Sequence, residues 1–257
     1  MQFLHYFKKT LEKLNSEQYN FFYIYSDLRF FGRFKQPNLN KQQFLEAITS
    51  CLVDMNVTLV IPTFTYTTSG NFNVQKTKTH LGALNSYILD KVGIKRSEHP
   101  LFSFASLGEG CNLIKHIGKS AFGRNSVHER LIGRNTAFLY LGRPVSLGNT
   151  MIHYVEQLLN VDYRFEKVFP TNVYDEDNFL GNDYSAFVRK SDNLENNYAF
   201  SFKKAARILH SQGLIKQTIL ENEYSNISLI PYDASLESLK NMLRKDENVF
   251  LQKKLLH

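Results

Sequence analysis

Four short apolar segments along the chain have the composition of buried β-strands. They are residues 21–26 (FFYIYS), 58–64 (TLVIPTF), 136–142 (TAFLYLG) and 226–232 (NISLIPY). β-Branched and aromatic residues favour strands, and nearly continuous apolar runs are typical of a sheet that is covered on both faces. The pattern therefore predicts a central sheet between two outer layers.

Between these segments the apolar residues recur at helical spacing. The segment 38–54 follows Pro37 and carries one apolar stripe, which consists of Phe44, Leu45, Ile48, Cys51 and Leu52. Residues 81–93, 184–190 and 205–213 suggest further helices, and Gly213 ends the last of them. Alternating strands and helices predict an α/β fold, layered α/β/α around a central, largely mixed sheet.

The N-terminal residues 1–14 also have a helical period. Phe3, Phe7, Leu11 and Leu14 are spaced three or four residues apart, with lysines between them. This favours an amphipathic helix that packs on the domain over a signal peptide or a membrane anchor. No apolar run approaches the roughly 20 residues that span a bilayer, so we expect no membrane partner.

The chain shows no internal repeat and no low-complexity linker, so we expect a single domain over residues 1–257. Residues 171–197 differ from the rest, with six acidic and two basic residues, many Asn and few aliphatic side chains. This composition predicts an exposed polar excursion. A plain surface insertion is favoured over a loop that covers substrate, because long loops are only sometimes functional.

The charge balance is basic, with 31 Lys and Arg against 24 Asp and Glu and a formal net charge of +7. Such a surface attracts anions. The sequence has no long Lys/Arg run and no nucleic-acid-binding motif, so phosphate-bearing small molecules are expected in preference to nucleic acid. The two cysteines, Cys51 and Cys111, form no disulfide framework, and a reducing cytoplasm is the default location.

Several familiar motifs are approached but not completed. Residues 116–120 (HIGKS) end like a phosphate-binding P-loop, but Leu113 stands where the first glycine is required. Residues 107–112 (LGEGCN) begin like a dinucleotide fingerprint, and the same leucine replaces its third glycine. Cys/His spacing for zinc and a Gly-x-Ser-x-Gly elbow are also missing. We therefore expect no metal and no serine nucleophile.

The pair His153 and Glu156 stands out in the apolar run 149–159 (NTMIHYVEQLL). At i and i+3 the two side chains share one helix face. Asn149 or Thr150 can cap the helix, which places the histidine in the first turns, where the helix dipole disfavours the imidazolium. A neutral imidazole beside a carboxylate is a usable general base. A surface ion pair on an amphipathic helix is the alternative interpretation.

The chain resembles the aminoglycoside 3-N-acetyltransferases, also called the antibiotic N-acetyltransferase family. Residues 139–169 are similar to the family's glycine-bearing strand, polar turn and His-x-x-Glu helix. The other similar segments follow the family's order and are residues 24–32, 59–67, 79–110, 121–131 and 209–222. The resemblance implies the family's own α/β fold and acyl transfer from acyl-CoA to a sugar amine.

The resemblance also implies roles for individual residues. His153 would be the catalytic base, and Glu156 would position the histidine or the amine. The residues that would bind acyl-CoA are Ser26, Asp27, Leu28, Phe122, Gly123 and Ser126. The residues that would bind the acceptor are Thr63, Phe64, Tyr66 and His99. For His99, which precedes Pro100, a structural turn histidine is the alternative interpretation. Arg124, Arg134 and Arg143 are further candidates for contacts with phosphate.

The acceptor is a separate question from the chemistry. Val127 and Ser146 replace a proline and an aspartate that are frequent in the family. A basic protein steers polycations away and diphosphates inward, which favours a nucleotide-linked 3-amino-3,6-dideoxyhexose for bacterial surface polysaccharide over an aminoglycoside. Aminoglycoside 3-N-acetylation, acyl-CoA hydrolysis and non-catalytic binding of a phosphate ligand remain open, as does the oligomeric state.

Overall fold

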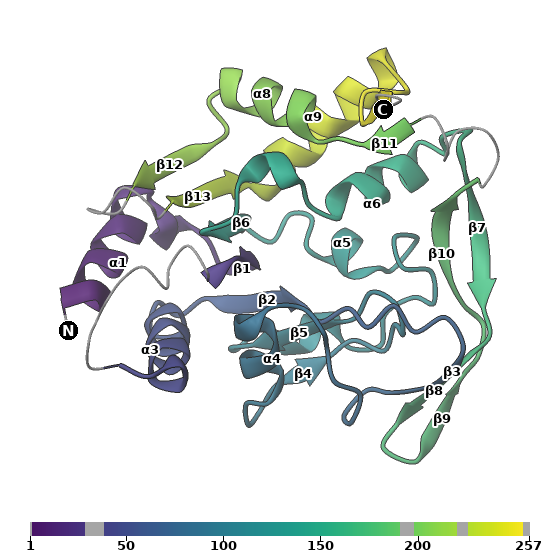
Figure 1. The fold of residues 1–257 in the computed structure, drawn as a ribbon, viewed down its shortest axis with the longest axis horizontal. Helices are drawn as coiled ribbons and strands as arrows, with labels where there is room; N and C mark the ends of the chain where they lie inside the picture. Colours follow the sequence, from purple (N-terminus) through teal and green to yellow (C-terminus); the bar gives the residue numbers. More distant parts are fainter. Residues whose placement is uncertain (1, 29–38, 191–197, 220–225, 254–257) are drawn as a thin grey trace.

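Figure 1 shows the computed structural model, which describes residues 2–28, 39–190, 198–219 and 226–253. Its centre is a seven-stranded sheet with the strand order β12-β13-β6-β1-β2-β5-β4, which runs from top to bottom in Figure 1. The strands are β1 (Phe21–Ser26), β2 (Thr58–Pro62), β4 (Lys95–Arg96), β5 (Phe104–Leu107), β6 (Thr136–Leu141), β12 (Lys216–Ile219) and β13 (Asn226–Pro231). All four predicted strands belong to this sheet.

The sheet is mixed, as predicted. β1 pairs in parallel with both β2 and β6, while β13, β12, β5 and β4 pair in antiparallel fashion with their neighbours. The carboxyl ends of the three parallel strands therefore lie at one edge of the sheet. In Figure 1 the arrows of β1 and β2 point toward the side on which α6 and the β7–β10 pair lie.

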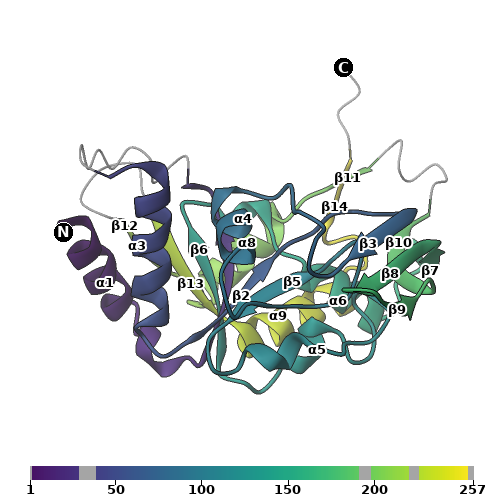
Figure 2. The ribbon, with the colours of Figure 1, turned by 90° about the horizontal axis from the view of Figure 1, so that it is seen from below.

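Helices cover both faces of the sheet, because alternate residues of each strand point to opposite sides. Phe22 and Ile24 face a core that α1 (Gln2–Lys13), α3 (Lys41–Val53) and α4 (Ala83–Leu89) complete. Tyr23 and Tyr25 face a larger core, which α5 (Val127–Arg130), α6 (Met151–Leu158), α8 (Lys203–Ser211) and α9 (Tyr232–Lys245) complete. Figure 2 shows the molecule turned by 90°, with α1 and α3 side by side.

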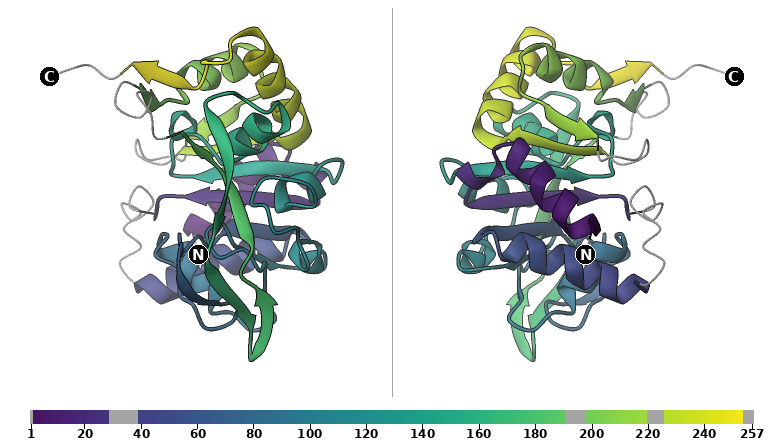
Figure 3. Two further views of the ribbon diagram at one scale, coloured as in Figure 1. Left: turned by 90° about the vertical axis from the view of Figure 1, so that its right-hand side faces the viewer. Right: turned by 90° about the vertical axis from the view of Figure 1, so that its left-hand side faces the viewer.

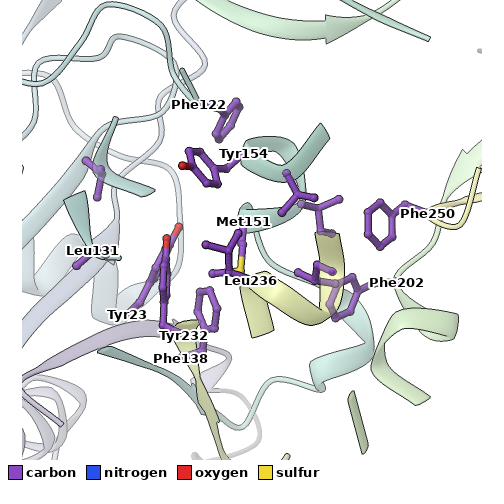
Figure 4. Packing of buried hydrophobic residues seen from close by; sticks show 14 of the residues in the cluster. Tyr23, Phe122, Leu131, Phe138, Met151, Tyr154, Phe202, Tyr232, Leu236 and Phe250 are labelled. Atoms are coloured by element: carbon purple, nitrogen blue, oxygen red, sulfur yellow. The ribbon is translucent and has the colours of Figure 1, made fainter. Parts of the chain in front are cut away.

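The larger core is rich in aromatic rings. Figure 4 shows Tyr23, Phe138 and Tyr232 together, and the ring centroids of Phe138 and Tyr232 lie 5.0 Å apart. Phe202 and Phe250 pack together at the far end of the same cluster. This core holds α6 against the sheet.

The helix predictions for 1–14 and 38–54 are confirmed. Phe7 and Leu11 of α1 are fully buried, and α3 begins with a capping box in which Asn40 and Gln43 exchange two hydrogen bonds of 2.9 Å. Residues 1 and 38 and the side chain of Phe3 lie outside the described parts of the chain. The predicted helices 81–93 and 205–213 are present as α4 and α8, with somewhat different bounds.

The prediction of a helix over 184–190 is wrong. This segment is β10 (Tyr184–Arg189), which pairs in antiparallel fashion with β7 (Arg164–Phe169). A short apolar run does not distinguish a strand from a buried helix by its periodicity. The pairing with β7 decides between them here.

Residues 171–190 of the predicted polar excursion form strands with exposed positions at 176–179 and 182–183, and residues 191–197 lie outside the described range. The segment continues from β7 through β8 (Thr171–Asp175), β9 (Asn178–Gly181) and β10, and β8 also pairs with β3 (Gly70–Asn73). Val173 and Tyr184 are buried in a small core of their own. Figure 3 shows the β7–β10 pair crossing the face turned toward the viewer in its left panel.

The remaining elements are short. They are the 3-10 turns η1 (Ser16–Gln18), η2 (Cys111–Ile114) and η3 (Val145–Leu147), and the strand pair β11 (Tyr198–Phe200) and β14 (Leu251–Lys253). The described helices include none that is long and apolar enough to cross a membrane.

Candidate active site

The site begins where β6 ends and α6 starts. The Oδ1 atom of Asn149 accepts a hydrogen bond from the backbone N–H of Met151 at 3.1 Å, so Asn149 supplies the cap of α6. Thr150 stands at the N-cap position but makes no side-chain cap. Its hydroxyl is used in a buried network instead. His153 therefore occupies the first turn of the helix, as the sequence predicts.

His153 and Glu156 are in direct contact. The Nδ1 atom of His153 lies 2.8 Å from Oε2 of Glu156, and the carboxylate is fully buried, whereas the side chain of His153 is 27% exposed. Because the carboxylate accepts, Nδ1 carries the proton of the neutral ring and Nε2 keeps its lone pair. The pair is thus a partly exposed base held by a buried anion, not a surface ion pair.

Two further side chains hold Glu156. The hydroxyl of Tyr163 donates to Oε1 at 2.8 Å, and Nε of Arg164 lies 2.8 Å from Oε2. Burial alone raises the pKa of Glu156, but the hydrogen bond and charge of His153, the charge of Arg164 and the Tyr163 hydroxyl together lower it below its usual value. Glu156 is therefore an anion at neutral pH, although it is fully buried.

His153 opens onto a cavity of about 370 Å³ at the carboxyl ends of β1 and β2. The ring of Phe122 packs edge-on against the imidazole, with the centroids 5.3 Å apart. Besides His153, the residues that line the cavity are Tyr25, Ser26, Pro62, Phe64, Tyr66, Leu81, Gly82, Asn85, Arg143, Leu147, Gly148, Asn149, Thr150 and Phe200. This set, drawn from the described residues, includes one arginine and no carboxylate.

A buried network below the cavity was not predicted from the sequence. Thr150 Oγ1 lies 2.6 Å from the hydroxyl of Tyr23 and 3.0 Å from Nε2 of His128. The hydroxyl of Tyr25 contacts both the hydroxyl of Tyr23 and Oγ1 of Thr150. Nδ1 of His128 lies 3.0 Å from the hydroxyl of Tyr232. Burial, and then the charge of His153, lower the pKa of His128 to about 3, so this ring stays neutral. The network fixes the start of α6 and hence the position of His153.

Three of the predicted ligand-binding residues line the cavity: Ser26, Phe64 and Tyr66. Tyr66 is 56% exposed at the rim. Asp27 and Leu28 follow β1 directly, outside the lining, and Leu28 packs against the core on the α3 side. Roles for these residues in binding remain predictions.

Four other predicted residues, Phe122, Gly123, Ser126 and Thr63, are not part of the cavity lining, and their roles in binding also remain predictions. Phe122 is buried behind His153, and Gly123 is tightly enclosed, since an added Cβ would lie 2.8 Å from Ser120 Oγ. Ser126 caps α5 by accepting from the N–H of Glu129. Thr63 is fully buried, with its hydroxyl 3.2 Å from that of Ser103.

His99 is also buried and does not line the cavity. Its Nδ1 atom accepts from the N–H groups of Leu101 and Phe102, and its Nε2 atom lies 2.9 Å from the carbonyl oxygen of Ser185. Burial lowers its pKa to about 4. Both ring nitrogens are engaged within the protein, which favours the alternative of a structural turn histidine; a role of His99 in binding the acceptor remains a prediction. His99 joins the turn before β5 to β10.

Of the three arginines considered for phosphate contacts, only Arg143 reaches the cavity. Its guanidinium lies 5.7 Å from the ring centroid of Tyr25 and donates to the carbonyl oxygen of Leu147 at 3.2 Å. Throughout the described ranges there is no group of three or more His, Cys, Asp or Glu side chains that could hold a metal ion.

The fold and the site define an α/β protein with a histidine–carboxylate pair at the carboxyl ends of its parallel strands. Comparison with known proteins identifies the family. The chain belongs to the aminoglycoside 3-N-acetyltransferase family (Antibiotic_NAT), whose profile matches residues 24–243. The predictions of this family and of an N-acyltransferase are thereby confirmed. No curated protein sequence matches the chain.

Solved structures share the fold over nearly the whole chain. Sisomicin-bound AAC-VIa is 14% identical, with a TM-score of 0.77 over 94% of this chain and 97% of that one. The apoenzyme of the aminoglycoside acetyltransferase AAC(3)-IVa is 18% identical, with a TM-score of 0.71 and coverage of 95% and 89%. AAC-IIIb with bound CoASH is 15% identical, with a TM-score of 0.74 and coverage of 93% and 94%. The predicted fold class is confirmed.

Proposed function

We propose that this protein transfers an acetyl group from acetyl-CoA to a primary amine of an amino sugar, with His153 as the general base. The observation that carries the proposal is the His153–Glu156 contact at 2.8 Å, beside a cavity at the strand ends. Family membership supplies the reaction class. Use of CoA is supported by the relative whose structure contains CoASH.

The chemistry follows from the tautomer of His153. Nε2 accepts a proton from the sugar amine while the amine nitrogen attacks the thioester carbon. An amide bond forms, the C–S bond breaks, and the proton passes from His153 to the leaving thiolate. The Glu156 carboxylate stabilises the imidazolium that exists between these two proton transfers. No covalent acyl-enzyme is required.

Aminoglycosides are the first acceptors to test. They are named in the family description, and related structures contain sisomicin, apramycin and a gentamicin. A 3-amino group on such a compound presents the primary amine that the mechanism needs.

A nucleotide-linked 3-amino-3,6-dideoxyhexose is the second candidate, and one specific observation favours it. The described lining of the cavity carries Arg143 and no Asp or Glu. Polycationic aminoglycosides are expected to bind where several carboxylates converge, whereas a diphosphate gains from an arginine. The formal net charge of +7 would likewise attract an anionic substrate and repel a polycation.

A thiol-release assay separates these candidates. Acetyl-CoA is combined with an aminoglycoside panel, with a dTDP-linked 3-amino-3,6-dideoxyhexose, or with no acceptor. We expect acceptor-dependent release of CoA and a mass increase of the acceptor by one acetyl group. Equal thiol release without any acceptor would instead indicate hydrolysis of acyl-CoA.

The variant His153→Asn tests the base directly. Loss of a general base lowers the rate by roughly 10²- to 10⁴-fold. We expect this loss in kcat, with binding of CoA little changed. His80→Asn is the matched control, because His80 is exposed and lies outside the cavity lining. Turnover by His153→Asn at the rate of the control would refute the proposed role.

A further inference from the structure

A second groove adjoins the cavity and shares Arg143 with it. We call it the α8 groove; its volume is about 640 Å³. Four basic side chains line it: Arg143 after β6, and Lys203, Arg207 and His210 on α8. The rest of its lining is neutral, and no described Asp or Glu contributes to it.

The sequence of α8 explains why the basic residues lie together. Lys203, Arg207 and His210 are spaced i, i+4 and i+7, so they form one stripe along the helix. Ala205 and Leu209 form the opposite stripe and are buried in the larger core. Packing of that apolar stripe therefore turns the basic stripe outward, toward the groove.

A close backbone contact holds α8 next to the cavity. Gly148 has φ +74°, and a Cβ atom at this position would lie 3.1 Å from Cβ of Phe202, the residue before α8. Only glycine lets the η3 turn approach the helix start so closely. The guanidinium of Arg143 donates a hydrogen bond to the carbonyl oxygen of Leu147 in the same turn. The cavity and the groove are thus built on one support.

Among the described residues, the Lys and Arg side chains of the groove have no carboxylate counter-charge. In the described part of the chain, no carboxylate lies within ion-pair distance of Arg143, Lys203 or Arg207, whereas the neighbouring Lys204 pairs with Asp246 at 2.8 Å. The Nε atom of Arg143 is also buried without a hydrogen-bond partner. Cations that line one concave surface and have no ion-pair partner in the described ranges are suited to an anionic ligand.

We propose that the α8 groove binds the phosphate groups of a substrate whose reacting end lies beside His153. The inference rests on the proposed function and names the chemistry of its substrate. Because Arg143 lines both spaces, one extended molecule can occupy them together. Two sources share this chemistry: the 3′-phosphate and diphosphate of CoA, and the diphosphate of a nucleotide-linked amino sugar.

Isothermal titration calorimetry tests the proposal without turnover. CoA, dephospho-CoA and dTDP are titrated into wild-type protein, into the double variant Lys203→Gln/Arg207→Gln, and into Lys204→Gln. The control removes a charge from the same helix that does not line the groove. For the double variant we expect roughly a 10-fold higher Kd of the phosphate ligand at low salt, and a smaller difference at high salt, as for exposed charges. For the control we expect a change below about twofold.

Each outcome has a definite meaning. If the double variant binds CoA more weakly but dTDP normally, the groove belongs to the acyl donor. Titration of dephospho-CoA then shows whether the 3′-phosphate is the group recognised. A loss confined to dTDP assigns the groove to the acceptor. Unchanged binding of both ligands, or no binding of either to the wild type, overturns the proposal.

Thermal melts confirm that the variants fold; if the double variant does not, the two single variants decide the outcome. The turnover assay remains an independent test of the proposed function. Acetyl transfer by a protein whose groove variants bind normally would refute the groove alone. Groove-dependent binding by a protein that acetylates no amine would refute the function alone.

Discussion

The substitution Glu156→Gln tests the electrostatic core of the mechanism. It keeps the shape of the side chain and can still hold the ring of His153, but it removes the buried negative charge 2.8 Å from Nδ1. For two unit charges about 4 Å apart, an effective dielectric constant of about 20 gives an interaction of about 4 kcal/mol.

The expected kinetic effect is smaller than this full interaction. The side chain of His153 is 27% exposed, and solvent screening reduces the interaction to about 2–3 kcal/mol. A loss of that size from the transition state lowers kcat/KM by roughly 30- to 150-fold.

Stability needs a separate control, because Glu156→Gln also removes the counter-charge of Arg164, whose side chain is 8% exposed. Breaking a buried ion pair costs about 3–5 kcal/mol. The double variant Glu156→Gln/Arg164→Gln should recover part of the free energy of unfolding, measured in urea, but none of the activity. A folded Glu156→Gln protein with kcat/KM within about threefold of wild type would refute the reasoning.

Two other predictions concern the supports of the site. The unfolded chain protonates His99 and His128 below a pKa of about 6.5, whereas the folded chain keeps them neutral down to about 4 and about 3. The contribution of each histidine to the free energy of unfolding is therefore fully present above pH 6.5 and decreases as the pH falls, by about 2 kcal/mol for each histidine at pH 5. Urea midpoints that are equal at pH 7.5 and 5 would contradict this. For Gly148→Ala, the backbone at φ +74° and ψ −178° and the approach to Phe202 predict a loss of about 1–3 kcal/mol, and a melting temperature that does not fall would show that the close approach is unimportant.

The strands that build the sheet could be read from the sequence because their burial is local in origin. β1, β2, β6 and β13 are almost wholly apolar, and a segment of that kind is stable only when both of its faces are covered. The helical stripes of α1, α3 and α8 are equally local. The i,i+3 spacing of His153 and Glu156 likewise follows from the geometry of one helix.

The wrong helix prediction arose where long-range pairing decides. Residues 184–190 form a strand because β7 lies beside them, and nothing within those residues specifies that partner. His99 lies in a segment that resembles the family's His-Pro region, yet its ring nitrogens are engaged by neighbouring N–H groups and by the carbonyl oxygen of Ser185, 86 positions away. A pattern identifies residue types, but only folding determines their partners.

The sequence by itself determined the class of fold, the family and the placement of His153 and Glu156 on one helix face, because each depends on local spacing or on ordered motifs. Only the tertiary structure decided that Tyr163 and Arg164 keep Glu156 ionised, that His128 stays neutral beneath the site, and that a basic groove adjoins the cavity at Arg143. These features depend on desolvation and on contacts between separate elements. Both arise only when the chain has packed, since water and neighbours set the charge of each group.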